Sequence, residues 1–309
     1  MSMPQKMVRR LERTESLDRA AKPLSKAVQR VVKPRFVRNV LSGTNTGHPL
    51  HPTLTDVTIG AWTMASLLDV MGGHESEQAA DMLVTTGVAA ALPTALTGLN
   101  DWSDTLGEDR RVGLVHAAMN SAALGMYIAS LVERVRGNRM RGKMLGFAGL
   151  GMMSVSAYLG GHLSFVKGVN VNRTAYHEGP DEWTPVLGDN ELAEGQHRVA
   201  DAGGVPILLH RAQGKVYALD AVCSHMGGPL DEGTFERGCV TCPWHGSTFR
   251  FTDGHIMRGP ASTPQPAYET RVENGRIEVR VPPLGVSGGP ADDHHARTRR
   301  RHMAGTSTS

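Results

Sequence analysis

The sequence predicts a multi-domain protein of α and β parts, with an N-terminal four-helix transmembrane bundle and a C-terminal small all-β domain. Long segments without charge are confined to residues 54–166, and short apolar runs separated by turn residues fill residues 178–283. The 309 residues include only 3 Cys, too few for a disulfide framework to hold a secreted module together. We therefore expect packed domains, with predicted divisions at 1–45, 46–170, 178–283 and 284–309.

The first 40 residues are strongly basic, with eleven Lys or Arg against three Asp or Glu, a net charge of +8. Pro23 and Pro34 bracket an apolar stripe with helical spacing, which indicates a basic amphipathic helix. Such helices lie on anionic membrane lipid. A solvated basic tail is the alternative. We expect no nucleic-acid binding, because an adjacent membrane explains the charge and no basic groove with interleaved aromatic residues is visible.

Four segments predict transmembrane helices. Met82–Asn100, Val112–Val132 and Met144–Val166 have 19, 21 and 23 residues without a charged side chain, close to the roughly 20 residues that cross a bilayer. Val57–Leu68 is shorter and is the weakest of the four. Their many Gly, Ala, Ser and Thr residues let membrane helices approach closely. The alternative is a buried four-helix bundle in a soluble protein.

The C-terminal third predicts a β-domain built from hairpins. Short apolar runs such as Val205–Leu209 and Ile277–Val281 alternate with turn signals such as Gln213-Gly214 and Asn274-Gly275. Residues 284–309 have no apolar periodicity, and we expect a disordered tail with exposed His294, His295 and His302.

Two pairs of metal-ligand residues lie in this β-domain. The first is Cys223-Ser-His225, and the second is Cys242-Pro-Trp-His245. Thiolate and imidazole are the ligands of iron–sulfur and zinc sites. A zinc site of two Cys and two His is the alternative, although zinc-finger pairs are usually Cys-Cys and His-His.

The stretches C-S-H-M-G-G-P-L and C-P-W-H-G-S-T-F, with their separation, resemble the Rieske [2Fe–2S] family over about a third of the chain. The resemblance implies one cluster per subunit, with one iron on two Cys and the other on two His. It also implies that small residues around the cluster let backbone N–H groups approach its sulfides. These surrounding residues are Gly227, Gly246, Ser247 and, in a third loop, Pro260.

Departures from the respiratory Rieske proteins point toward the Rieske-type ferredoxins. The two cysteines that form a disulfide in the former correspond here to Gly228 and Trp244, and their cluster-bound tyrosine corresponds to Phe249. Fewer hydrogen bonds to the cluster lower its potential, so we expect a value near the lower end of about −150 to +300 mV. The third cysteine, Cys239, is predicted to be a strand residue.

The helical part is similar to an uncharacterised four-helix membrane domain family, as seen in G-H-P-L-H-P from Gly47 and Y-L-G-G-H ending at His162. Four spans bring His48, His51, Asp101, His116 and His162 to one membrane face. Ionisable residues inside spans are usually functional. His51, His116 and His162 are therefore candidate ligands of a b-type haem or a quinone, with helix capping as the alternative.

These observations predict a membrane-bound one-electron carrier that serves an unidentified redox partner protein, a reductase or an acceptor. The alternative is a membrane oxidoreductase, a subunit or a single chain, that passes electrons between the cluster and a quinone or haem in the helical domain. A non-redox membrane anchor is a third hypothesis. The basic N-terminus and the acidic first loop favour a multi-pass topology with the Rieske domain in the cytoplasm, whereas arginines between residues 134 and 141 favour the opposite.

Overall fold

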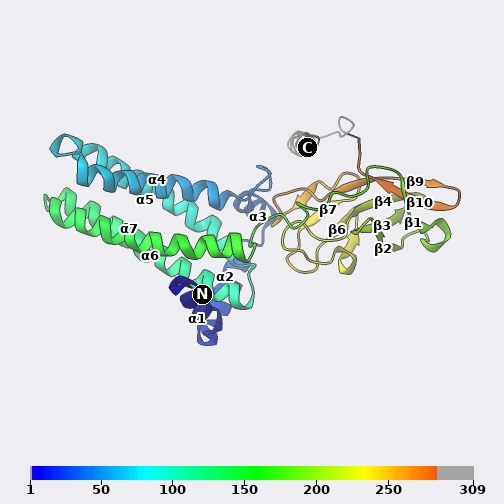
Figure 1. The fold of residues 1–309 in the computed structure, drawn as a ribbon, viewed down its shortest axis with the longest axis horizontal. Helices are drawn as coiled ribbons and strands as arrows, with labels where there is room; N and C mark the ends of the chain where they lie inside the picture. The colour runs from blue at the N-terminus through cyan, green and yellow to red at the C-terminus, as the bar shows by residue number, and fades with distance from the viewer. Residues whose placement is uncertain (1, 284–309) are drawn as a thin grey trace, which may run out of the picture. The chain divides into compact units, whose positions relative to one another are not determined.

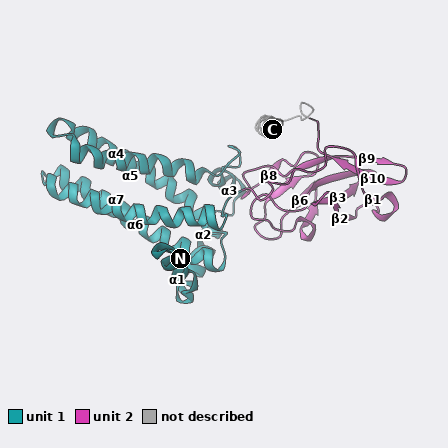
Figure 2. Cartoon of the chain, viewed as in Figure 1, with its two compact units in different colours: residues 1–171 teal, residues 172–309 magenta. Residues whose placement is uncertain are grey.

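The computed structural model describes residues 2–283, which form two compact units that divide between Val171 and Asn172. Figure 2 distinguishes the helical first unit from the β-rich second unit. The predicted tail, residues 284–309, lies outside the described residues.

Three short helices begin the first unit: α1 (Met3–Arg13), α2 (Asp18–Val31) and α3 (Arg35–Ser42). Helix α2 runs through Pro23 and does not begin at it, which corrects the predicted start. The helix is docked on the helical unit by Ser25 and Gln29, whose side chains both donate to the carbonyl of Ser103. The basic segment is therefore folded onto the helical unit.

Four long helices follow: α4 (Leu50–Met71), α5 (Glu77–Trp102), α6 (Gly107–Val135) and α7 (Arg139–Gly161). They pack most closely as two hairpins, α4 with α5 and α6 with α7 (Figure 1). Three helices are long and apolar enough to cross a membrane: those within His74–Trp102, Gly107–Val135 and Arg139–Val166. Helix α4 has 22 residues but does not meet the same measure, so the predicted count of four spans is not confirmed.

The second unit contains a six-stranded sheet in the order β1-β10-β9-β4-β3-β2 and a four-stranded sheet in the order β5-β6-β7-β8. The strands of the larger sheet are β1 (Thr184–Gly188), β2 (His197–Ala202), β3 (Val205–Ala212), β4 (Lys215–Asp220), β9 (Ala267–Glu273) and β10 (Arg276–Arg280). Those of the smaller sheet are β5 (Thr234–Glu236), β6 (Cys239–Thr241), β7 (Thr248–Arg250) and β8 (Ile256–Arg258).

The predicted hairpin turns are confirmed. Gln213 and Gly214 join β3 to β4, and Asn274 and Gly275 join β9 to β10, all four with φ between 50° and 73°. Two residues with positive φ match the twist of the strands that they connect.

Candidate metal centre

The two Cys–His pairs lie in two loops. The first loop follows β4, and the second connects β6 to β7. Both loops close with the same backbone hydrogen bonds. Gly227 N–H donates to Cys223 O at 2.9 Å and Gly246 N–H donates to Cys242 O at 3.1 Å. Each cysteine N–H in turn donates to the carbonyl five residues later, on Gly228 and Ser247.

The loops bring the four predicted ligands together. Cys223 and Cys242 are buried, and their thiols share a hydrogen bond. The imidazole rings of His225 and His245 have centroids 5.1 Å apart and are nearly perpendicular. His225 is buried, whereas His245 is partly exposed. Cysteine thus meets cysteine and histidine meets histidine, as a two-iron cluster with unlike irons requires.

The space between the loops also fits this group. A Cβ added to Gly228 would lie 2.7 Å from Cys242 Sγ, so only glycine allows this close approach. Within the described residues, no three His, Cys, Asp or Glu side chains are placed to hold one metal ion. A Rieske cluster takes two protein ligands on each iron, so a pair of pairs is the arrangement that it needs.

The predicted surrounding residues line these loops. Gly227 and Gly246 have φ of 79° and 75°, a conformation that glycine adopts without a Cβ penalty. Ser247 is fully buried, and its Oγ accepts the N–H of Ala261 at 2.9 Å. Because Oγ accepts this bond, the hydroxyl proton is left for another acceptor. Pro260 is buried next to Ala261, so the third loop does pack against the second.

The sequence did not indicate Gln265, which fastens the first loop. Its Oε1 accepts the N–H of Ser224 at 2.9 Å, and its Nε2 donates to the carbonyls of Asp220 and Val222 at 2.9 and 2.6 Å. The side chain is only 2% exposed. A glutamine between two prolines carries no signal of such a role, because the contacts span about forty residues.

A buried acidic group lies at the base of the same loop. Asp220 has no exposed surface, its Oδ1 accepts the N–H of Val222, and its Oδ2 bonds to His177 Nδ1. Burial raises the pKa of Asp220, and the hydrogen bond from His177 opposes that rise. His177 precedes the predicted domain, which began at residue 178, so sequence reasoning missed this pair.

Two further predictions concern the second loop and its strands. Cys239 is in β6, as predicted, and is partly exposed. Phe249, in β7, is completely buried within the core that surrounds the ligand loops. Its ring brings no hydroxyl to this region.

In the helical unit, the structure brings together two of the three candidate histidines. His51 and His116 have ring centroids 6.4 Å apart. His162 instead lies 3.2 Å from Glu12, between its Nε2 and Oε1. His48 is exposed and bonds to the carbonyl of Pro49.

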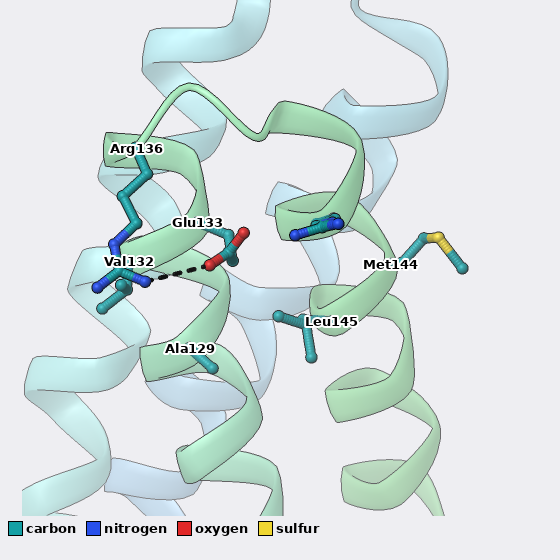
Figure 3. Close-up of a pocket in the computed structure, with 7 residues that line it drawn as sticks. Ala129, Val132, Glu133, Arg136, Met144 and Leu145 are labelled. Atoms are coloured by element: carbon teal, nitrogen blue, oxygen red, sulfur yellow. Dashed lines mark hydrogen bonds and ion pairs between the residues drawn. The ribbon is translucent and has the colours of Figure 1, made fainter.

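Figure 3 shows a separate open hollow near the α6–α7 connection. It contains an ion pair, Arg136 with Glu133 at 3.5 Å, in which Arg136 is exposed. This pair does not form a catalytic site. The residues that line it are Ala129, Val132, Glu133, Arg136, Arg141, Met144 and Leu145.

The β-fold and the paired ligand loops define an iron–sulfur protein of the Rieske class. The family description "Rieske [2Fe-2S] domain" matches residues 182–269, and "Predicted membrane protein (DUF2231)" matches residues 47–173. The chain is 33% identical over 100 residues to the anthranilate 1,2-dioxygenase ferredoxin subunit of Burkholderia cepacia, covering 32% of this chain and 93% of that protein. The chain belongs to the Rieske [2Fe–2S] family, with a DUF2231 domain in its N-terminal half.

Other similarities cover the same third of the chain. Apoptosis-inducing factor 3 of Mus musculus is 32% identical over 91 residues, 29% of this chain and 15% of that protein's length. The ferredoxin of carbazole 1,9a-dioxygenase from Nocardioides aromaticivorans IC177 is 28% identical. That match covers 33% of this chain and all of the ferredoxin, with a TM-score of 0.31.

Proposed function

We propose that this protein is a membrane-bound one-electron carrier. Cys223 and Cys242 hold one iron of a [2Fe–2S] cluster, and His225 and His245 hold the other. The cluster, when bound, accepts and releases one electron. The relatives that are ferredoxin subunits support this role, and the partner is a redox protein, either a reductase or an acceptor.

One observation carries the proposal. The two loops repeat the same hydrogen bonds around Cys223 and Cys242, so two thiolates face each other with two imidazoles beside them. The partly exposed His245 forms the accessible edge of the site, while Cys223 and Cys242 are shielded from water. An electron can leave through the histidine edge without exposing the sulfur ligands.

The helical unit supports a membrane location. The spanning candidates are buried over only 22–28% of their apolar windows, and their exposed apolar side chains, such as Leu92, Ile128 and Phe147, suit lipid. We assign α4 as a fourth span beside these three. The result is a multi-pass protein with both ends of the helical domain on one side.

We place the Rieske domain in the cytoplasm. The arginines near the α6–α7 connection had favoured the opposite orientation, but ion pairs within the fold engage two of them. Arg134 contacts Asp69 and Asp81, and Arg139 contacts Asp81. Because the charges of these two have a structural role, we give the basic N-terminus the greater weight in setting the orientation. Reporter fusions test this: Gly137 should report the outside and Ser309 the cytoplasm, and the reverse pattern overturns it.

Spectroscopy of the full chain in detergent tests the cluster. We expect iron and sulfide in equal amounts and a Rieske-type EPR signal on reduction. Cys242→Ser should abolish both. Cys239→Ser is the matched control, because it removes a nearby thiol in the same hairpin and should leave both intact. Zinc in place of iron, or no EPR signal from an iron-loaded protein, contradicts the proposal and favours a non-redox membrane anchor.

A second function has one specific observation in its favour. The histidine pair His51 and His116 lies inside the helical domain, where a quinone or haem would exchange electrons with the cluster. The protein would then be a membrane oxidoreductase, as one subunit or as a single chain. A redox-active group that copurifies with the full chain is the expected sign.

A further inference from the structure

The helical domain is built from two copies of one hairpin. Residues with the same role are 65 apart in the first helices of the two hairpins and 62 apart in the second helices. The matched positions are His51 and His116, Trp62 and Tyr127, Asp69 and Arg134, and then Gly87 and Gly149, Thr94 and Ser156, Gly98 and Gly160. Three of the six pairs are identical residues, so the repeat is visible mainly through its contacts.

Each copy holds its histidine in the same way. His51 Nδ1 bonds to the carbonyl of Thr94 at 3.0 Å, and His116 Nδ1 bonds to the carbonyl of Ser156 at 2.8 Å. Each ring lies over the glycine four residues after that carbonyl. A Cβ on Gly98 or Gly160 would lie 2.6 or 2.9 Å from the Cε1 atom of its histidine.

The two copies meet along a pseudo-two-fold axis. His51 pairs with His116, and Trp62 stacks on Tyr127 with centroids 4.0 Å apart. Asp69 Oδ1 accepts from Arg134 Nη1 at 3.0 Å. Matched residues therefore face their own counterparts, and both hairpins run in the same direction (Figure 1).

The hydrogen bonds fix which nitrogen of each histidine is available. A carbonyl oxygen can only accept, so Nδ1 carries the proton in both rings and Nε2 keeps a lone pair. Asn120 Nδ2 lies 3.1 Å from Nε2 of His116, consistent with that lone pair. This is how metal-binding histidines are held, whereas a quinone oxygen would need an N–H donor.

The pair is also spaced for a single ion. Metal–imidazole bonds are about 2 Å and the nitrogen is about 1 Å from the ring centre, so two imidazoles on opposite sides of one ion have centroids about 6 Å apart. The observed separation is 6.4 Å. No third protein ligand is at hand among the residues described, so the remaining positions must come from the ligand itself.

The buried apolar core of the bundle lies away from the His51–His116 pair. The buried core around Trp62 and Tyr127 begins at least seven residues from the histidine or glycine level in each of the four helices, about 10 Å along a helix. His51, His116, Gly98 and Gly160 are only partly buried. At this level the fully buried apolar residues are Val112 and Leu159, which pack with Val8 of α1 in a separate cluster.

We propose that His51 and His116 bind the iron of one haem from its two faces. Two imidazoles and the four porphyrin nitrogens complete six-coordination, and Asn120 gives up its bond to Nε2 when iron takes that lone pair. The site rests on the second function above, and it excludes His162 from the ligand set. When bound, the haem would supply one-electron chemistry: its iron would be reduced as the [2Fe–2S] cluster is oxidised, and His51 and His116 would keep their Nδ1 protons throughout.

The test uses the full chain, expressed with haem supply and purified in detergent. We expect a pyridine haemochrome with one haem per chain and the spectrum of low-spin, six-coordinate iron. His51→Gly and His116→Gly should each lose that spectrum, and added imidazole should restore it. His162→Ala and His48→Ala are matched controls and should keep haem fully.

The EPR signal of the Rieske cluster separates the two proposals. Its retention in His51→Gly, together with loss of haem, supports the haem site. Haem-free wild-type protein with a full cluster overturns the haem site alone, as does haem that survives His51→Gly. Loss of haem in His162→Ala with an intact cluster also overturns it.

Discussion

The Nδ1 atom of His177 lies 2.5 Å from Oδ2 of Asp220, a carboxylate without exposed surface three residues before Cys223. The other oxygen of Asp220 accepts the N–H of Val222. A segment that precedes the first strand is thus joined to the base of a ligand loop by a hydrogen bond between His177 and a buried carboxylate.

His177→Ala should destabilise the Rieske domain by about 1–3 kcal/mol, because the buried carboxylate of Asp220 loses its side-chain hydrogen bond and keeps only the one from Val222. The measurement is thermal unfolding of the full chain at neutral pH. His255→Ala removes an exposed imidazole elsewhere in this domain and should change little. A negligible effect of His177→Ala would mean that the carboxylate is already neutral.

The same variant predicts a pH dependence. Burial raises the pKa of Asp220, and His177→Ala removes the hydrogen bond that opposes this rise. The folded state then binds a proton more tightly than the unfolded state, so its stability is fully present below the ordinary Asp pKa and is lost as the pH increases through the raised value. The unfolding temperature of His177→Ala should therefore fall, relative to wild type, as the pH rises above the ordinary Asp pKa of about 3.9. Asp220→Asn combined with His177→Ala should remove this slope.

Gln265→Leu should loosen the first ligand loop while keeping the volume of the side chain. It leaves one buried N–H and two carbonyls without this partner, at about 1–3 kcal/mol for each unsatisfied group. We expect the variant to lose iron faster on dilution into a chelator. The decay of the visible absorbance of the cluster measures this rate. Gln196→Leu, an exposed glutamine, is the control. Equal rates in the two variants would rule out the fastening role.

Ser247→Ala should lower the midpoint potential of the cluster. If the hydroxyl donates to a cluster sulfur with about 1 kcal/mol, the loss corresponds to about 40 mV for a one-electron couple. Redox titration followed by EPR measures the shift. The wild-type value itself is expected near the lower end of the family range, since Phe249 offers no hydroxyl. An unchanged potential in Ser247→Ala would mean that the Ser247 hydroxyl bonds only to Ala261 and not to the cluster.

Asp69→Ala should destabilise the helical domain by about 1–3 kcal/mol, because Arg134, whose side chain is 1% exposed, loses one of its two carboxylate partners and keeps only Asp81. Thermal unfolding of the protein in detergent, monitored by circular dichroism, measures the difference. Arg136→Ala removes a guanidinium that is 67% exposed and should alter stability by less than about 0.5 kcal/mol. Similar losses in both would show that burial is not the source of the effect.

Local features could be predicted from the sequence, and long-range ones could not. The ligand loops are short and combine rare residue types, so Cys223, His225, Cys242 and His245 are visible from spacing alone. Hairpin turns such as Asn274-Gly275 require a backbone conformation that few residues adopt. The hydrogen bonds of Gln265 and His177 connect distant segments through common residue types. No sequence pattern within either segment predicts them.

The helical domain illustrates the same limit. The predicted spans contained His116 and His162 but left out His51, which lies in α4. Which histidines meet depends on how the hairpins pair: His51 is the residue beside His116, and His162 instead contacts Glu12. The internal repeat is hard to detect in the sequence because Trp62 matches Tyr127 and Asp69 matches Arg134, pairs that share a role and not an identity.

Duplication within one chain also frees the two halves to evolve apart. A dimer of identical hairpins would present the same environment on both sides of its axis, and every substitution would occur twice. Here Thr55 stands one turn from His51, at the position that Asn120 takes beside His116. The two sides of the histidine pair can therefore acquire different polarity, which gives the central site a direction that no symmetric assembly could have.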